Sequence, residues 1–439
     1  MRLLSFYGDD FTGSTDVMEA LATHGVKTVL FTRRPSADEM SAFEDCAAIG
    51  LAGTSRSETP AWMDEHLPGI FSWLKSLEAR FSHYKVCSTF DSSPAIGNIG
   101  RAVEIGRDVF GQDLVPLVVG APQLKRYTAF GNLFAGYQGE TYRIDRHPVM
   151  SRHPVTPMPE ADLRLHLAQQ TQLPVSLVPL TALGSATPDV EVDACLAHCT
   201  GMALFDVIDR SSQCETGRQL LRLAGSGPVF VAGSSGIEYA LLPVLAERRE
   251  IECTTRFAAL PAVERIMVVS GSCSPTTSRQ IRHALGAGFA GIEVDPVRLA
   301  AEPQYQIEII ADAGRLLGQG HSVVAYTALD GGTKGTELDA IPGGRHAVGE
   351  ALGNILRDAA RTHQLSRVII AGGDTSSHAL GQLDAFALTT RFPLKQSPGS
   401  PLCVGHSSDP AFDGIEIAMK GGQVGADDYF TMLRDGITG

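Results

Sequence analysis

The chain has 439 residues, of which 44% are hydrophobic and 19% charged, and its formal net charge is -13 at pH 7. One domain usually takes roughly 100 to 200 residues, so this length predicts two or three domains. The acidic balance, without clusters of Lys and Arg, argues against a nucleic-acid-binding surface. A few local bases would still suffice to bind an anionic small molecule.

No apolar run approaches the length of about 18 residues that a membrane span requires. The N-terminal MRLLSFYGDD also reaches its acids before the core of a signal peptide could form. We therefore expect a cytoplasmic protein without a membrane partner, and the sequence leaves a homo-oligomer open. The eight cysteines include no CxxC pair, which argues against disulfides and a structural zinc site. The sequence assigns no metal ligands.

Short apolar runs alternate with amphipathic segments along the chain. Residues 27–31 and 47–53 are typical of buried strands, and residues 62–81 repeat apolar positions at helical spacing. Parallel strands joined by helical crossovers produce this alternation. The pattern weakens after Ala246 and restarts at Ile266. We therefore predict an α/β fold of two domains with largely parallel sheets, comprising residues 1–248, a linker at 249–263, and residues 264–439.

The stretch LSFYGDDFTGSTD, residues 4–16, has the pattern of a strand, a tight loop and a helix start. Open α/β proteins bind ligands at the carboxyl ends of strands, where helix N-termini supply unpaired N–H groups. Asp9 and Asp10 stand side by side in this loop, followed by Thr12. Two adjacent acids favour a cation, a hydroxyl or a shared proton. One of them could simply cap the helix, which would account for only one of the two.

A second polar loop follows the strand that ends near Lys85. It contains Ser88, Asp91 and Ser92 within KVCSTFDSSPAIGNIG. Because a carboxylate accepts from sugar hydroxyls while Lys and backbone N–H groups bind a carboxylate, this loop suits a polyhydroxy acid. The alternative is a Ser-rich turn that satisfies only its own backbone.

Residues 127–159 are predicted to be irregular, because Arg and His alternate there with prolines. We interpret this segment, which includes Arg146, as a loop that closes over an anionic substrate; a solvated surface excursion is the alternative. The turn at residues 233–236 resembles a nucleophile elbow, but it lacks the GxSxG spacing and an evident His partner. This argues against a serine hydrolase.

Three strand ends in the second half carry small residues that let phosphate oxygens approach the backbone. Together they predict a nucleotide phosphate site, in which Asp374 could hold magnesium or cap a helix. A literal GxGxxG begins at Gly286, but it precedes a strand instead of following one, which is the wrong context for a dinucleotide site. The predicted nucleotide-binding residues are Ser270, Gly271 and Ser272 after the first strand, Gly372, Gly373, Asp374 and Thr375 after the second, and Gly421 and Gly422 after Lys420 at the third.

Several stretches together resemble the four-carbon acid sugar kinases, formerly a family of unknown function. They run in family order from Gly8 to Phe430 as YGDDFTGSTD, KVCSTFDSS with GNIG, HPVTPM, SGSCSPTT, AGGDTSS and AMKGGQVGADDYF. The resemblance implies an N-terminal acid-sugar domain and a C-terminal nucleotide domain. It also implies ATP-dependent phosphorylation of the terminal hydroxyl of threonate, erythronate or 3-oxo-tetronate. By this resemblance, Asp9, Asp10, Thr12, Lys85, Ser88, Asp91 and Ser92 belong to the substrate side, and Ser270, Ser272, Gly372, Gly373, Asp374, Thr375 and Gly421 to the ATP side.

The chain departs from the family pattern at Gly8, where many relatives carry Ala, at Asp374, where they carry Glu, and at residues 420–425, where a KSGNFG-like ending is usual. These departures leave the branched acid 3-oxo-isoapionate as an alternative substrate. A non-catalytic sugar-acid sensor and a haloacid-dehalogenase-type phosphatase are competing classes, although the DxDxT spacing of the latter is absent.

Phosphoryl transfer depends mainly on positioning and charge neutralisation. We expect Asp9 or Asp10 to take the proton of the terminal hydroxyl, and Lys85 and Arg146 to bind the substrate carboxylate. The glycine-bearing loops, with Mg2+, would hold the triphosphate of ATP. The expected active site is a cleft between the two domains, which closes to exclude water.

Overall fold

The computed structural model describes residues 2–437, apart from residues 154, 226, 253–255, 330–336 and 339. It divides into two compact units, and the predicted α/β fold with two domains and mostly parallel strands is confirmed. Unit 1 comprises Met1–Val29 and Glu39–Thr255, and unit 2 comprises Leu30–Asp38 and Arg256–Gly439. No helix in the described part of the chain is both long and apolar enough to cross a membrane.

Unit 1 is built on a parallel sheet with the strand order β3-β1-β4-β11-β5-β10-β9. Its central strands are short and buried, and most of their residues are apolar, as expected for strands buried on both faces; β4 is the exception, with Ser82, His83 and Lys85. The strands are β1 (Leu4–Gly8), β3 (Ala48–Ala52), β4 (Phe81–Lys85), β5 (Val115–Val118), β9 (Val175–Val178), β10 (Met202–Phe205) and β11 (Val229–Gly233).

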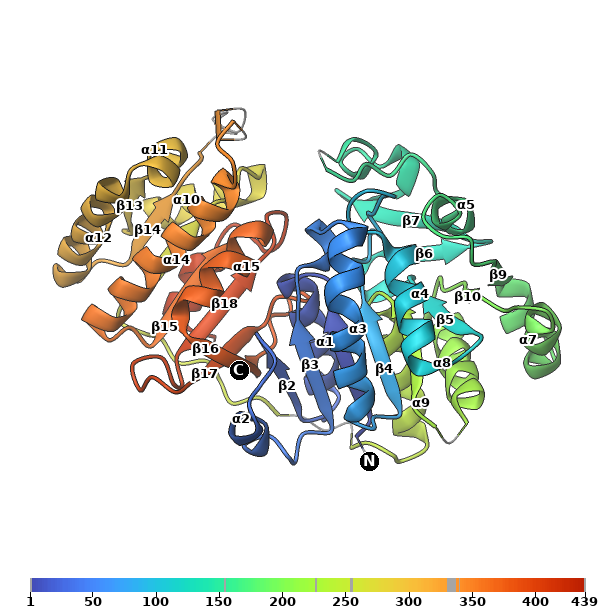
Figure 1. Cartoon of the computed structure of the whole chain (residues 1–439). Helices are drawn as coiled ribbons and strands as arrows, with labels where there is room; N and C mark the ends of the chain where they lie inside the picture. Colours follow the sequence, from blue (N-terminus) through green and yellow to red (C-terminus); the bar gives the residue numbers. More distant parts are fainter. Residues whose placement is uncertain are drawn as a thin grey trace. The chain divides into compact units, whose positions relative to one another are not determined.

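Helices cover this sheet in two groups. Helix α3 packs against α4, and α9 packs against both α1 and α8 (Figure 1). The helices of unit 1 are α1 (Phe11–Thr23), α3 (Pro60–Ser76), α4 (Ile99–Phe110), α5 (Leu163–Leu167), α6 (Leu180–Leu183), α7 (Pro188–Leu196), α8 (Arg210–Ala224) and α9 (Gly236–Glu247). The helix predicted over residues 62–81 ends at Ser76, because Glu78 turns the chain with a φ of 52° and Phe81 begins β4.

The prediction that residues 127–159 are irregular is wrong for their first half. This part forms a three-stranded antiparallel meander of β6 (Arg126–Ala129), β7 (Asn132–Tyr137) and β8 (Glu140–Arg143). Tight turns at Gly131 and Gly139, both with positive φ, join these strands. The prolines of residues 127–159 lie only beyond these strands, from residue 148 onward, and within β7 buried positions alternate with half-buried ones before the end of the strand.

Unit 2 contains five parallel strands in the order β13-β14-β12-β15-β18, followed by antiparallel β17 and β16. Strands β16 and β17 pair with each other as a hairpin. The strands are β12 (Met267–Ser270), β13 (Ala290–Glu293), β14 (Val323–Tyr326), β15 (Arg367–Ala371), β16 (Ala385–Phe392), β17 (Leu402–Ser407) and β18 (Glu416–Lys420).

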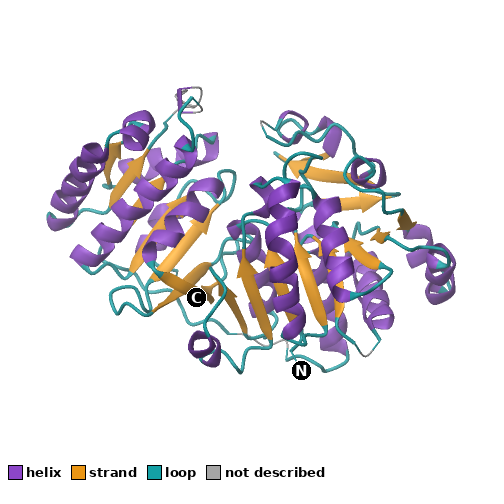
Figure 2. Cartoon of the chain, in the orientation of Figure 1, coloured by secondary structure: helices purple, strands orange, loops and turns teal. Residues whose placement is uncertain are grey.

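The strands of unit 2 also lie between helices (Figure 2). One group consists of α14 with α11, α12 and α15, and a second of α10 with α16. Prolines at the first turns of α10, α11 and α12 favour these helix starts. The helices are α10 (Pro275–Gly286), α11 (Pro296–Ala301), α12 (Pro303–Gly318), α14 (Gly344–His363), α15 (Gly373–Leu380) and α16 (Tyr429–Asp435).

A short N-terminal segment, Leu30–Asp38, clusters with unit 2 because of strand pairing. Leu30 and Phe31, at the end of β2 (Thr28–Phe31), pair antiparallel with Leu388 and Ala387 of β16. Helix α2 (Ala37–Ser41) begins at the end of this segment. The chain therefore crosses between the two units three times. The domain boundaries at 1–248, 249–263 and 264–439 stay a prediction, and residues 253–255 of that linker lie outside the described residues.

Candidate active site

Strand register brings four loops of unit 1 to one level of the sheet. Gly8 at the end of β1 pairs with Ala52 of β3 and Lys85 of β4, and Lys85 pairs in turn with Gly233 of β11. Because these strands are parallel, the loops that follow them emerge side by side at the same edge. The polar side chains of the candidate sugar site come from three of these loops, after β1, β3 and β4.

Asp10 is the N-cap of α1. Its carboxylate accepts hydrogen bonds from the backbone N–H of Gly13 at 2.5 Å and from the Thr12 hydroxyl at 3.2 Å. It also accepts one from Arg56 Nη1 at 2.8 Å. Of the two adjacent acids, Asp10 is therefore the one that caps the helix, and the Thr12 hydroxyl donates to the same carboxylate.

Asp9 is buried, and its Oδ1 atom has no hydrogen-bond partner among the described residues. Burial and the charge of Asp10 raise the pKa of Asp9 to about 7, although Arg56 and Lys85 act in the opposite direction. Its backbone N–H donates to the Lys85 carbonyl at 2.9 Å, which ties it to β4. Asp9 is therefore held rigidly by its backbone while its carboxyl group can exchange a proton near neutral pH.

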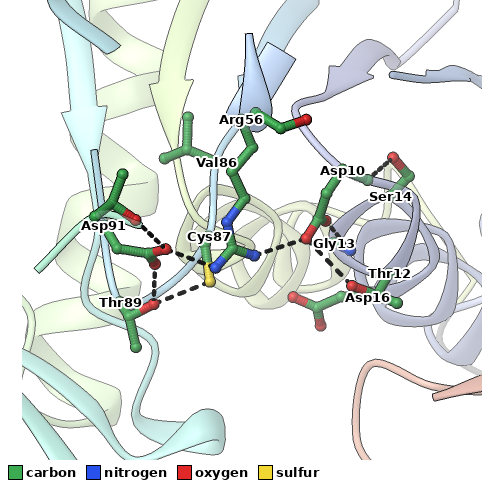
Figure 3. Close-up of polar contacts among 12 residues, drawn as sticks. Asp10, Thr12, Gly13, Ser14, Asp16, Arg56, Val86, Cys87, Thr89 and Asp91 are labelled. Atoms are coloured by element: carbon green, nitrogen blue, oxygen red, sulfur yellow. Dashed lines mark hydrogen bonds and ion pairs between the residues drawn. The ribbon is translucent and has the colours of Figure 1, made fainter. Parts of the chain in front are cut away.

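Arg56 joins two loops by binding two carboxylates at once. Its Nη1 lies 2.8 Å from Asp10 Oδ2, and its Nη2 lies 2.6 Å from Asp91 Oδ2. Figure 3 shows the guanidinium group between these two acids. Burial alone would raise the pKa of Asp91, but Arg56 and the Thr89 hydroxyl, at 2.5 Å, hold it at about 2.

Two residues of the acid cluster, Arg56 and Thr156, were not predicted from the sequence. The Thr156 hydroxyl donates a hydrogen bond to Asp91 Oδ2 at 3.3 Å. Arg56 follows β3 in the loop GTSRS, so its position at a strand end was the available signal. Thr156 lies within the HPVTPM stretch that supported the family resemblance. Neither residue belongs to a periodic pattern, and their partners are far away in sequence.

Lys85 is fully buried at the end of β4. It donates to the Val86 carbonyl at 2.9 Å, and its Nζ lies 3.8 Å from Asp16 Oδ2. Burial alone would lower the pKa of Lys85, but Asp16 and Asp9 hold it above its usual value. A Cβ atom at Gly13 would lie 3.1 Å from Nζ, which places the ammonium group beneath the first turn of α1.

The two serines of the second loop differ in their surroundings. The hydroxyl of Ser92 is buried, 2.8 Å from His166 Nε2 and 2.9 Å from Gln170 Nε2. Burial lowers the pKa of His166 to about 4, which keeps its ring neutral at pH 7. Ser88 is only half-buried. Ser92 therefore supports the loop from behind, whereas Ser88 is the more accessible hydroxyl.

Among the described residues, Arg146 makes no contact with the acid cluster formed by Asp9, Asp10 and Asp91. Its side chain is 76% exposed, and its ion pair is with Asp145 at 3.8 Å. Burial lowers the pKa of Arg126 of β6, while the charges of Cys87 and Asp91 act in the opposite direction. Arg126 Nη1 donates to the carbonyls of Leu124 and Lys125, and its buried Nε has no partner in the described part of the chain.

In unit 2, the three predicted phosphate loops are brought together. Ser270 at the end of β12 pairs in register with Ala371 of β15, which pairs with Lys420 of β18. The loops touch one another, since a Cβ at Gly271 would lie 2.2 Å from Thr375 Oγ1 and one at Gly422 would lie 2.9 Å from Ser272 Oγ.

The remaining residues of this predicted site differ in what surrounds them. Gly372 has a φ of 121°, which side chains rarely adopt, whereas a Cβ at Gly373 would have open space around it. A Cβ at Gly421 would make only ordinary contact, 3.6 Å from Val424. The side chain of Asp374 lies outside what the structure describes, so its two predicted roles stay open. Among the described residues, no group of three His, Cys, Asp or Glu is placed to hold a metal ion.

Two family models match the chain, a sugar-binding N-terminal domain over residues 4–241 and a nucleotide-binding C-terminal domain over residues 267–430. The chain belongs to this two-domain family. The resemblance found in the sequence is thereby confirmed at the level of the family. A 3-oxo-isoapionate kinase from Paraburkholderia graminis is 42% identical, with 99% of this chain and 94% of the relative covered. A 3-oxo-tetronate kinase from Pseudomonas fluorescens is 29% identical, with 100% and 97% covered.

Solved structures share the fold over the whole length of this family member. A putative tRNA synthase from Salmonella typhimurium has a TM-score of 0.76 at 22% identity, with 98% of both chains covered. A Haemophilus influenzae protein of the DUF1537 family has a TM-score of 0.70 at 22% identity, with 98% of this chain and 99% of that chain covered. At this level of identity, the likeness concerns the fold alone.

Replacing Arg56 by Met should destabilise the protein by about 2–4 kcal/mol at pH 7, because two partly or fully buried carboxylates lose their shared cation. Because the pKa of Asp91 is lower in the folded protein than in the unfolded chain, its ionisation stabilises the fold at pH values above the unfolded-state pKa. This stabilisation is lost as the pH falls toward 2. The difference between the wild type and Arg56→Met should therefore shrink from pH 7 to pH 3, which urea unfolding at each pH would measure.

Arg143→Met is the matched control, because it removes an ion pair of similar length in which the arginine is exposed and Asp145 retains Arg146 at 3.8 Å. We expect this variant to lose much less stability than Arg56→Met. Equal losses in the two variants would contradict the importance assigned to Arg56.

Proposed function

We propose that this protein is an ATP-dependent sugar-acid kinase, which transfers the γ-phosphoryl group of ATP to a terminal hydroxyl of its substrate. The observation that carries this proposal is that a sugar-binding and a nucleotide-binding model match successive parts of one chain. The relatives that align over nearly the whole chain are kinases for 3-oxo sugar acids. The buried acid cluster of unit 1 and the phosphate-type loops of unit 2 supply what this chemistry needs.

The substrate is proposed from the relatives and from the charge of the site. The 42% identity to the 3-oxo-isoapionate kinase supports the branched acid, while the 3-oxo-tetronate kinases, at 25–29% identity, support a linear four-carbon acid. Threonate and erythronate, expected from the sequence resemblance, remain candidates of the same class. All of these acids combine a carboxylate with a terminal hydroxyl, so the same catalytic groups serve each of them.

Asp9 is the residue that we propose as the general base. Asp10 is occupied by the helix cap and by Arg56, whereas Asp9 has an oxygen without a partner. As the hydroxyl oxygen forms its bond to the γ-phosphorus and the bond to the ADP oxygen breaks, the hydroxyl proton passes to Asp9. A base whose pKa is about 7 is about half ionised at neutral pH, and its ionised form accepts a proton readily.

ATP would bind at the loops after β12, β15 and β18. Their glycines leave room for phosphate oxygens, and Ser272 and Thr375 add hydroxyl donors to the backbone N–H groups. These features fit a magnesium-bound triphosphate, in which the metal neutralises phosphate charge; we propose that the phosphate chain itself holds Mg2+. The prediction that the reaction takes place in a cleft between the two domains stays a prediction.

For the substrate carboxylate, we propose Arg126 in addition to the predicted Lys85 and Arg146. Lys85 already has Asp16 as its counter-charge, and Arg146 lies exposed beside Asp145. Arg126 has no carboxylate within ion-pair distance in the described part of the chain and carries a buried Nε without a partner. An arginine left in this state favours a bidentate carboxylate ligand.

Asp9→Asn should lower kcat by about 10^2- to 10^4-fold, because the variant cannot accept the hydroxyl proton. In the wild type, kcat/KM should rise as the pH increases through about 7, since the base acts in its ionised form. Asp10→Asn should keep more activity and shift this inflection to lower pH, because the charge of Asp10 raises the pKa of Asp9. Steady-state rates from pH 5 to 9 would measure both effects. Wild-type turnover in Asp9→Asn would show that another group is the base.

Arg126→Met should raise KM for the sugar acid by about 10- to 100-fold with a smaller change in kcat, because a charged hydrogen-bond partner of the carboxylate is lost. The variant Arg146→Met serves as the comparison from the same region of the chain and should change KM less. If the larger rise in KM belonged to Arg146→Met, the sequence-based prediction would hold and the assignment of Arg126 would be withdrawn.

Release of ADP with a panel of four- and five-carbon sugar acids tests the function itself. We expect ADP with 3-oxo-isoapionate or with 3-oxo-tetronate, threonate or erythronate, and the highest kcat/KM identifies the substrate. No ADP with any acid, together with tight binding of one of them, would indicate a sugar-acid sensor. Free phosphate released from a phosphorylated acid without ATP would indicate a phosphatase.

A further inference from the structure

Lys420 is the last residue of β18, and its side chain is fully buried. In the sheet register it stands beside Ala371, whose own neighbour is Ser270, so it belongs to the same row of strand ends as the phosphate-type loops. Its Nζ atom donates a hydrogen bond to Thr277 Oγ1, in the first turn of α10, at 2.9 Å. The ammonium group therefore lies at the N-terminal end of that helix.

No described residue supplies a counter-charge for this cation. Among the described residues, no carboxylate lies within ion-pair distance of Lys420, and the neutral Thr277 hydroxyl is its one side-chain partner. Burial accordingly lowers the pKa of Lys420 to about 7. The two other buried cations differ, since Arg367 pairs with Glu416 at 2.6 Å and Lys85 has Asp16 at 3.8 Å.

On α10 and on β18 itself, the charged side chains that the structure describes pair with other residues. Arg279 of α10 pairs with Asp427 at 2.9 Å, and Glu416, at the other end of β18, binds Arg367 and Arg391. Burial is the only cause that shifts the pKa of Lys420. A buried cation without a partner is costly, so the site is complementary to an anion that the described residues do not provide.

The surroundings of Lys420 are built to admit such an anion. The Thr277 hydroxyl donates to the Gly422 carbonyl at 3.0 Å, and the Ser274 hydroxyl donates to the same carbonyl at 2.5 Å, which fastens the loop after β18 to the start of α10. A Cβ at Gly422 would lie 2.9 Å from Ser272 Oγ, so a larger residue would intrude on the phosphate-type loops. Small residues and a helix N-terminus together suit phosphate oxygens.

We propose that Lys420 binds a phosphate group of the nucleotide and that the nucleotide supplies the counter-charge that no described residue provides. Binding is accompanied by uptake of up to one proton from solvent onto Nζ. This inference deepens the proposed kinase function and rests on it. Its ligand class is a nucleoside di- or triphosphate. The proton balance follows directly, since an amine that is partly neutral in the free protein becomes an ammonium ion beside the phosphate.

Calorimetric titration of the full-length protein with ADP and with a non-hydrolysable ATP analogue, each with Mg2+, tests this proposal. Titrations in two buffers of different ionisation enthalpy give the number of protons taken up. The wild type should take up close to one proton at pH 8 and much less at pH 6, where Lys420 is already charged before the nucleotide binds. Lys420→Met should weaken binding by about 10- to 100-fold and abolish the uptake.

Two further variants keep the result unambiguous. Lys420→Arg, which stays charged, should bind nucleotide without proton uptake even if Lys420→Met fails to fold. Lys395→Met removes an exposed lysine of the same unit and should change neither affinity nor uptake. Wild-type affinity and uptake in the Lys420 variants would overturn this inference and leave the kinase assignment intact. Absence of nucleotide binding by the wild type would instead overturn the proposed function.

Discussion

The pair of ion pairs made by Arg56 is the interaction on which the sugar-side site depends. Asp10 and Asp91 come from different loops, and one guanidinium group holds both of them at 2.8 and 2.6 Å. With these two acids compensated, the burial of Asp9 is not fully offset, and its pKa rises accordingly; the pKa of Asp16, beside Lys85, is also raised by burial. Arg56 thus keeps Asp10 and Asp91 in structural ion pairs, while Asp9, which it does not bind, keeps a raised pKa.

Both units use the same structural device, but with different electrostatics. In each unit, parallel strands in register deliver their loops to one edge, and small or polar residues follow the strand ends. The buried lysine of unit 1, Lys85, has Asp16 as a partner within the fold, whereas Lys420 of unit 2 has none among the described residues. A lysine with an internal partner stabilises the fold, while one without a partner favours binding of an external anion.

Much of this architecture could be predicted from the sequence, because buried parallel strands are short apolar runs and the polar loops follow them directly. The loops around Asp10, Asp91, Ser270 and Gly372 were identified in this way, with their strands. Arg56 could not be, since it lies 46 residues from Asp10 and 35 from Asp91 and belongs to no periodic pattern. Only strand register brings these three residues together.

Other features escaped prediction because they depend on tertiary packing. The pairing of Leu30 and Phe31 with β16 joins segments more than 350 residues apart, and hydrophobic periodicity carries no information about such a partner. Arg146 is exposed just after the β6–β8 meander, and the sequence analysis treated this meander as part of one irregular segment. No described carboxylate lies within ion-pair distance of Lys420. The sequence alone does not predict this, because it depends on which side chains the fold places nearby.

The central claim is that Asp9 is a buried carboxyl group poised to accept a proton, and its titration in the folded protein tests this claim most directly. Carbon-detected NMR of the wild type, with Asp9→Asn used to assign the resonance, would follow the ionisation of this carboxyl group between pH 4 and 9. A midpoint near 7 that moves to lower pH in Asp10→Asn is the predicted result. A midpoint below about 4, the ordinary value for an aspartate, would contradict the account.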